Sequence, residues 1–120
     1  MNREITRQLL DFLQKSPSPY HAVANMAKEL VDHGYRCLYV EEGWELLPGG
    51  RYYVTRGGSA LIAFALPDQP KPESFQIMAS HSDSPTFKLK EAPELLVDDR
   101  FVKLNVEKYG GMLMAPWFDR

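Results

Sequence analysis

Residues 75–85 read FQIMASHSDSP, an apolar run that leads into a short polar segment carrying His81 and Asp83. The apolar part, Phe75 to Ala79, predicts a buried strand. The polar part begins where this strand ends, and in open α/β sheets ligands gather at the carboxyl ends of the strands. This stretch therefore predicts an α/β fold with a functional site at its polar end.

The site candidates are His81 and Asp83, two residues apart. Side chains at positions i and i+2 leave the same face of an extended chain, so these two are expected to converge. Imidazole is a good zinc ligand, and its second ring nitrogen is usually held by a carboxylate. We expect His81 to bind a metal and Asp83 to orient it. The alternative is a polar turn after a strand, because an H-x-D triplet is common by chance.

The first third of the chain predicts two helices. Residues 5–13 have apolar side chains at helical spacing, with Asn2 as a candidate cap. Prolines in residues 16–19 (SPSP) end this helix, and Ser18 then caps a second helix with Pro19 in its first turn. Gly34 is placed to end the second helix.

Strands are expected beyond Tyr35. Arg51 to Arg56 is rich in Tyr, Val and Thr, and residues 57–59 (GGS) are a turn signal. Ala60 to Leu66 is apolar at consecutive positions, which predicts an interior strand covered on both faces by helix layers.

After Pro85 the pattern changes to alternation of apolar and polar residues, as in Phe87 to Lys90 and Val102 to Glu107. This alternation predicts strands with one solvated face, as in a separate antiparallel sheet or barrel. We place a domain boundary near Lys90.

Charge and composition exclude some partners. The net charge is −2 and the isoelectric point is about 5.9, without a basic patch, so neither nucleic acid nor an acidic membrane surface is an expected partner. The longest apolar run is far shorter than a membrane helix, and the N-terminus lacks the apolar core of a secretory signal. A single cysteine, Cys37, fits a reducing compartment and predicts a small buried residue rather than a nucleophile. We expect a soluble, cytoplasmic protein.

Four segments together resemble the aspartyl aminopeptidase family of metallopeptidases. In chain order they are residues 16–23 (SPSPYHAV), 79–85 (ASHSDSP), 109–111 (YGG) and 116–120 (PWFDR). Their order and spacing match the family across nearly the whole chain, and the second and fourth segments are the most specific.

The resemblance implies a zinc-exopeptidase-type three-layer α/β fold, interrupted by an inserted β-rich assembly domain. Residues 1–90 would belong to the catalytic domain and residues 91–120 to the start of the inserted dimerisation domain. It also implies two divalent metals, usually Zn²⁺, that activate a water to attack the peptide bond after an N-terminal Asp or Glu. By motif, His81 is a metal ligand and Asp83 the catalytic carboxylate that orients it. Family members form homo-oligomers, commonly dodecamers built from dimers.

Length is the large departure from the family, whose chains are several times longer. A catalytic zinc needs about three protein ligands, and this chain offers one. We therefore expect the 120-residue chain alone to hold no catalytic metal tightly and to cleave no peptides. The alternative function is a non-catalytic peptide-binding or assembly module of the same fold.

Other polar residues favour structural roles. We expect His21 to pack or cap at a helix start and His33 to be exposed at a helix end. Residues 98–100 (DDR) predict a solvated turn, although a carboxylate metal site stays open as an alternative. Asp119 and Arg120 carry the family signature, and a structural or subunit-contact role is favoured for them.

Overall fold

The computed structural model describes residues 3–69 and 74–118. The chain divides into two compact units, Met1–Asp83 and Ser84–Arg120, which are considered separately. The sequence-predicted boundary near Lys90 lies inside a strand of the second unit, whereas the division itself follows Asp83.

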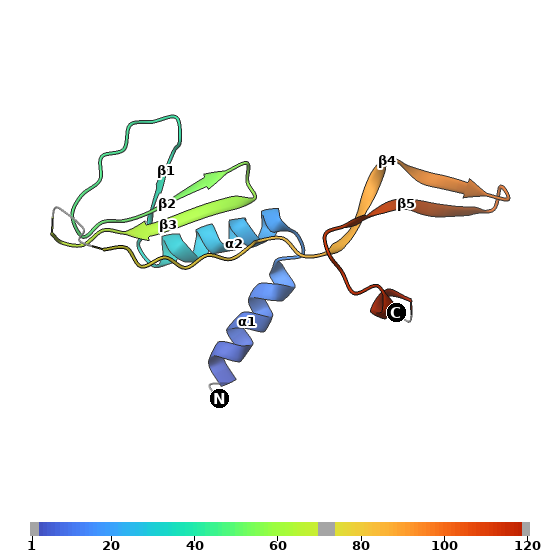
Figure 1. Cartoon of the computed structure of the whole chain (residues 1–120), viewed down its shortest axis with the longest axis horizontal. Coiled ribbons are helices and arrows are strands. Elements are labelled where there is room, and N and C mark those ends of the chain that lie inside the picture. The colour runs from blue at the N-terminus through green and yellow to red at the C-terminus, as the bar shows by residue number, and fades with distance from the viewer. Residues whose placement is uncertain (1–2, 70–73, 119–120) are drawn as a thin grey trace. The chain divides into compact units, whose positions relative to one another are not determined.

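Two helices open the first unit, as predicted (Figure 1). Helix α1 spans Arg3–Lys15 and helix α2 spans Pro19–Asp32. The side-chain amide of Asn25 on α2 donates hydrogen bonds to the Lys15 carbonyl (2.9 Å) and the Ser16 hydroxyl (3.1 Å), which fixes the hinge between the helices. The candidate cap Asn2 lies outside the described residues. No described helix has the length and apolar character needed to span a membrane.

The ends of α2 are set by local sequence signals. Ser18 is the N-cap, and its hydroxyl accepts a hydrogen bond from the His21 backbone N–H (3.4 Å). At the other end Gly34 adopts φ +80°, and its N–H donates to the Val31 carbonyl (3.0 Å) while Tyr35 N–H donates to the Leu30 carbonyl (2.9 Å). This pair of bonds is a Schellman motif, whose left-handed position suits glycine. Both predicted ends are confirmed.

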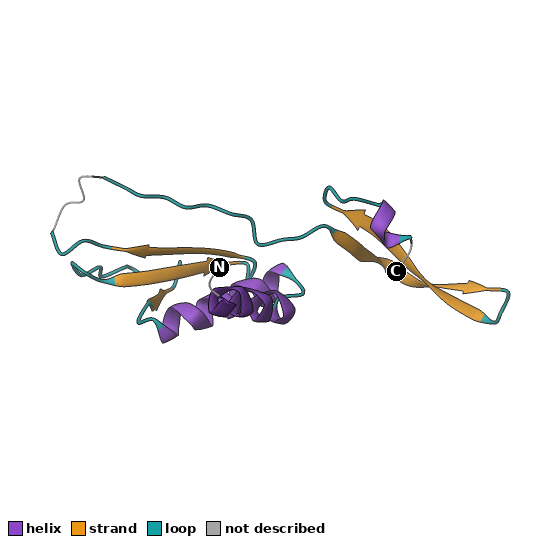
Figure 2. Ribbon diagram, turned by 90° about the horizontal axis from the view of Figure 1, so that it is seen from below, coloured by secondary structure: helices purple, strands orange, loops and turns teal. Residues whose placement is uncertain are grey.

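A three-stranded sheet follows, in the order β1 (Arg36–Leu38), β2 (Arg51–Arg56) and β3 (Ala60–Ala65). Strand β1 pairs with β2 in parallel, and β2 pairs with β3 in antiparallel. Helix α2 contacts all three strands and runs along one face of the sheet (Figure 2). The buried side chains of this unit are Ala22, Val23, Leu38, Tyr52 and Tyr53. Tyr53 faces α2, whereas its neighbour Tyr52 leaves the opposite face of the sheet, where its hydroxyl accepts a hydrogen bond from Leu47 N–H (2.8 Å).

The prediction that Ala60 to Leu66 forms an interior strand covered on both faces is wrong for the described residues. Strand β3 is at the edge of the sheet, and Ile62 is 67% exposed. Consecutive apolar residues indicate two covered faces only when two helix layers are available, and among residues 3–69 and 74–118 only α2 packs on the sheet.

The buried strand predicted at Phe75 to Ala79 is also wrong. Residues 74–85 have no regular secondary structure, and the side chains of Phe75, Ile77 and Met78 are 82%, 82% and 95% exposed. A strand needs a neighbour for its backbone N–H and C=O groups, and none pairs with this segment within residues 3–69 or 74–118.

The second unit is a two-stranded antiparallel ribbon of β4 (Thr86–Val97) and β5 (Phe101–Tyr109), followed by a 3₁₀ turn at Ala115–Trp117. Residues 98–100 form the exposed turn predicted from sequence, with φ +52° at Asp98 and +50° at Asp99. The register places Val102 opposite Leu96 and Val106 opposite Leu89, so one face of the ribbon is mostly apolar, with Glu94 opposite Leu104 as an exception. The predicted antiparallel strands are confirmed, but side chains on both faces of the ribbon are exposed rather than on one.

Candidate functional site

The His81–Asp83 segment follows the irregular residues 74–80 at the end of the first unit. His81 Nδ1 lies 2.8 Å from the Asp83 backbone carbonyl oxygen and 3.1 Å from the Asp83 carboxylate oxygen Oδ1. The His81 side chain is 81% exposed and that of Asp83 is 45% exposed. The predicted contact between the two side chains is therefore present.

These contacts decide which ring nitrogen carries the proton. A backbone carbonyl and a carboxylate oxygen only accept hydrogen bonds, so His81 Nδ1 must be the donor to both. In the neutral ring the lone pair then sits on Nε2, the nitrogen that points away from Asp83. A histidine with Nδ1–H held by a carboxylate and Nε2 open is the arrangement found in metal-binding histidines.

The route to this contact differs from the sequence argument. Strand alternation was expected to bring the two side chains to one face, but residues 81–85 are not a strand. The His81 ring instead contacts Asp83 within an irregular segment of the chain.

Ser82 fastens the same segment to the sheet. Its hydroxyl donates a hydrogen bond of 2.8 Å to the backbone carbonyl of Ser59, and the side chain is half-buried. Ser59 belongs to the turn between β2 and β3. This bond was not predicted from the sequence, because a contact between residues 23 positions apart leaves no local signal.

A complete metal site is not present among the described residues. Across residues 3–69 and 74–118, no group of three or more His, Cys, Asp or Glu side chains lies close enough to hold a metal ion. His21 and His33 are instead at the two ends of α2. His21 Nδ1 is 2.7 Å from the Ser18 hydroxyl, and His33 Nδ1 is 2.8 Å from the Glu29 carbonyl. Their predicted roles at helix ends are confirmed.

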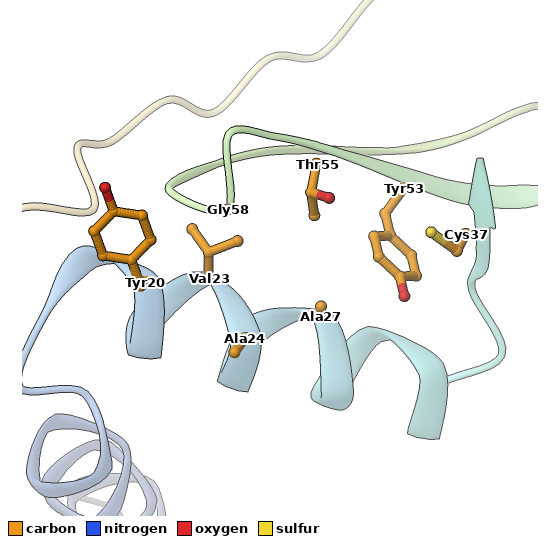
Figure 3. A pocket seen from close by; sticks show the side chains of 8 residues that line it. All are labelled: Tyr20, Val23, Ala24, Ala27, Cys37, Tyr53, Thr55 and Gly58. Carbon is orange, nitrogen blue, oxygen red and sulfur yellow. The ribbon is translucent and has the colours of Figure 1, made fainter. Parts of the chain in front are cut away.

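A pocket of about 250 Å³ lies between α2 and the sheet (Figure 3). Cys37 and Tyr53 lie near one end of it and Tyr20 near the other. Burial raises the pKa of the Tyr53 hydroxyl, and a hydrogen bond with Cys37 adds to the effect. His81 and Asp83 do not line this pocket. It is a small, largely apolar gap in the helix–sheet packing, and Cys37 is half-buried there, less buried than predicted.

Residues 12–120 match the sequence profile of a family described as "Aminopeptidase I zinc metalloprotease (M18)". A "Probable M18 family aminopeptidase 2" of Clostridium acetobutylicum is 42% identical over 98% of the chain. A protein of the same description from Pseudomonas aeruginosa is 46% identical over the whole chain. The chain spans 27% and 28% of the length of these two relatives.

Several solved structures are also similar to this chain. A chain in the "Cryo-EM structure of the Ape4 and Nbr1 complex" superposes with a TM-score of 0.89 at 41% identity, covering 94% of this chain and 22% of that one. Chaetomium thermophilum mApe1 gives 0.85 at 34% identity, covering 92% of this chain and 25% of that one. The S. cerevesiae mApe1 dodecamer gives 0.81 at 30% identity, covering 97% and 27%. The predicted α/β class is confirmed, and the chain has the fold of an N-terminal portion of these structures.

Proposed function

The chain belongs to the M18 family of aminopeptidase I zinc metalloproteases, and from this premise we propose that it is part of a metal-dependent aminopeptidase. The proposed reaction releases N-terminal residues, Asp or Glu in particular, from peptides. Because the chain spans 28% of the Pseudomonas aeruginosa relative, the activity belongs to a protein that includes the remaining segments.

The observation that carries this proposal is the hydrogen bond between His81 and Asp83. Nδ1–H donates to the carbonyl (2.8 Å) and the carboxylate (3.1 Å) of Asp83. The lone pair of Nε2 is therefore available to coordinate zinc. The exposed ring leaves room for a metal at Nε2. We assign His81 as a metal ligand and Asp83 as the catalytic-site carboxylate that fixes the tautomer and direction of His81.

The type of ligand that this chain offers suits zinc, but one ligand is fewer than a catalytic zinc site needs. Imidazole suits zinc, and a catalytic site uses about three protein ligands. This chain contributes His81, so the other ligands and the general base must come from other segments. Bound zinc, expected as a pair of ions, would polarise the peptide carbonyl and lower the pKa of a water toward about 7. We propose that the chain alone neither holds such zinc tightly nor cleaves peptides.

Two parts of the sequence, distinct from the two compact units, take different roles in this proposal. Residues 1–90 belong to the catalytic domain, and residues 91–120 begin an inserted β-rich domain that mediates dimerisation and larger homo-oligomers. The exposed apolar face of the β4–β5 ribbon supports an assembly role, because a two-stranded ribbon needs further cover to be stable. The solved S. cerevesiae relative is described as a dodecamer. A cytoplasmic location is part of the same proposal.

A second candidate is a peptide-binding or assembly module without catalysis. The observation that favours it is the lack of a three-ligand cluster among the described residues. The two functions differ in one respect that can be measured, because peptide binding by such a module would not depend on zinc.

The test uses a chimera in which this chain replaces the matching segment of the Pseudomonas aeruginosa relative. We expect the chimera to release N-terminal Asp or Glu from short peptides, to lose this activity with a chelator and to regain it with Zn²⁺. His81→Ala should abolish the activity and weaken zinc binding, because it removes a direct ligand. The matched control is His33→Ala, which changes an exposed histidine at the far end of α2.

Full activity of the His81→Ala chimera would overturn the assignment of His81. A chimera that folds and binds peptides equally well with and without zinc, but never cleaves them, would favour the non-catalytic module.

A further inference from the structure

Ser82 occupies the position between the two site residues, and its side chain points to the sheet. The hydroxyl donates to the Ser59 carbonyl at 2.8 Å and is half-buried, whereas the neighbouring His81 ring is 81% exposed. The middle residue of the segment is therefore attached to the folded core, while the histidine projects outward.

The acceptor belongs to a well-defined turn. Arg56 and Ala60 pair across the β2–β3 hairpin, and Ser59 N–H donates back to the Arg56 carbonyl (3.4 Å). Gly57 and Gly58 take φ values of +60° and +70° inside this turn, which glycine adopts without strain. A Cβ atom on Gly58 would lie 3.4 Å from the Tyr20 ring of α2, so the turn also packs against the helix.

The residues that lead into this segment, 74–80, are largely exposed. Residues 74–85 form no strand pairing within the described part of the chain, and Phe75 and Met78 are 82% and 95% exposed. The bonds from His81 to Asp83 are local, so they set the ring relative to its own backbone. They do not set where that backbone lies on the sheet.

We propose that Ser82 is a positioning residue whose hydroxyl fixes the His81–Asp83 segment on the β2–β3 turn and thereby sets where His81 Nε2 meets a metal. The attachment is independent of function, but its consequence for metal binding rests on the function proposed above. Removing a residue that orients a metal ligand without contacting the metal typically weakens metal binding by about 10–100-fold.

The chain offers matched variants for a test in the chimera. Ser82→Ala removes the donor, while Ser82→Thr keeps it. Ser59→Ala is the control, because Ser59 contributes its backbone carbonyl and loses only its side chain. Zinc affinity, measured by competition with a chromogenic chelator, is expected to fall about 10-fold in Ser82→Ala. It should stay close to the parent value in Ser82→Thr and Ser59→Ala.

A second readout needs no metal. Amide hydrogen exchange of residues 80–84 in the metal-free chimera should be faster in Ser82→Ala and unchanged in Ser82→Thr. If Ser82→Ala fails to fold, Ser82→Thr and Ser82→Val decide the question, since they have nearly the same shape and differ in the hydroxyl. The Val variant should then show the weaker zinc binding and the faster exchange.

The outcomes separate this inference from the proposed function. Parent zinc affinity and parent exchange rates in both Ser82→Ala and Ser82→Val would overturn the positioning role and leave the aminopeptidase proposal intact. A parent chimera that binds no zinc would overturn the proposed function and, with it, the consequence for metal binding, while the exchange data would still test the attachment.

Discussion

The helix–sheet core and the segment that carries His81 are both rich in apolar residues, yet their surroundings are opposite. Val23 on α2 is 3% exposed and Tyr52 on β2 is 3% exposed, whereas Met78 and Phe75 are 95% and 82% exposed. Tyr52 packs against Phe64 of the neighbouring strand and accepts a hydrogen bond from Leu47 N–H, while residues 74–80 have no paired strand within the described part of the chain. The difference teaches that apolar composition predicts burial only where a partner surface exists.

The largest expected effect comes from two aromatic residues on the two sides of this comparison. Tyr52→Ala should lower the free energy of unfolding by about 3–5 kcal/mol, because it removes a buried ring from the core. Phe75→Ala should change it by no more than about 0.5 kcal/mol, because the ring is in solvent. Urea denaturation followed by circular dichroism measures both. Equal losses in the two variants would show that residues 74–80 pack against the core in solution.

A smaller effect is expected from two serines. Ser18→Ala should cost about 1 kcal/mol, because the helix α2 loses its capping hydroxyl. Ser80→Ala, in the exposed segment, is the matched control and should be close to neutral. The same denaturation experiment applies, and a neutral Ser18→Ala would contradict the assigned cap.

The smallest effect concerns alkaline pH. Burial raises the pKa of Tyr53, so the folded state favours the protonated hydroxyl more than the unfolded state does. The resulting stability is fully present below the unfolded tyrosine pKa of about 10 and is lost as the pH rises through the folded value. In Tyr53→Phe the decline of unfolding free energy above about pH 10 should be shallower. Identical alkaline profiles for the parent and Tyr53→Phe would contradict the raised pKa.

Local signals explain what the sequence predicted well. Ser18, Pro19 and Gly34 define helix ends through bonds to residues a few positions away, so both helices were predictable. Residues 57–59 marked the β2–β3 turn in the same way.

Features that depend on distant partners were predicted less well. Strand β1, three residues long, forms by pairing with β2 and was not foreseen. The strand expected at Phe75 to Ala79 lacks a partner in the described part of the chain. In the site, the His81–Asp83 contact was expected from strand alternation but forms within an irregular segment, and the Ser82–Ser59 bond joins residues far apart in sequence.

The most direct test of the account is a crystal structure of the chimera with zinc bound, with anomalous scattering recorded at the zinc edge. The account predicts a zinc ion at about 2.0–2.1 Å from His81 Nε2, with Nδ1 still donating to Asp83. Zinc bound without His81, or coordinated through its Nδ1, would contradict the claim that Asp83 prepares this histidine as a metal ligand.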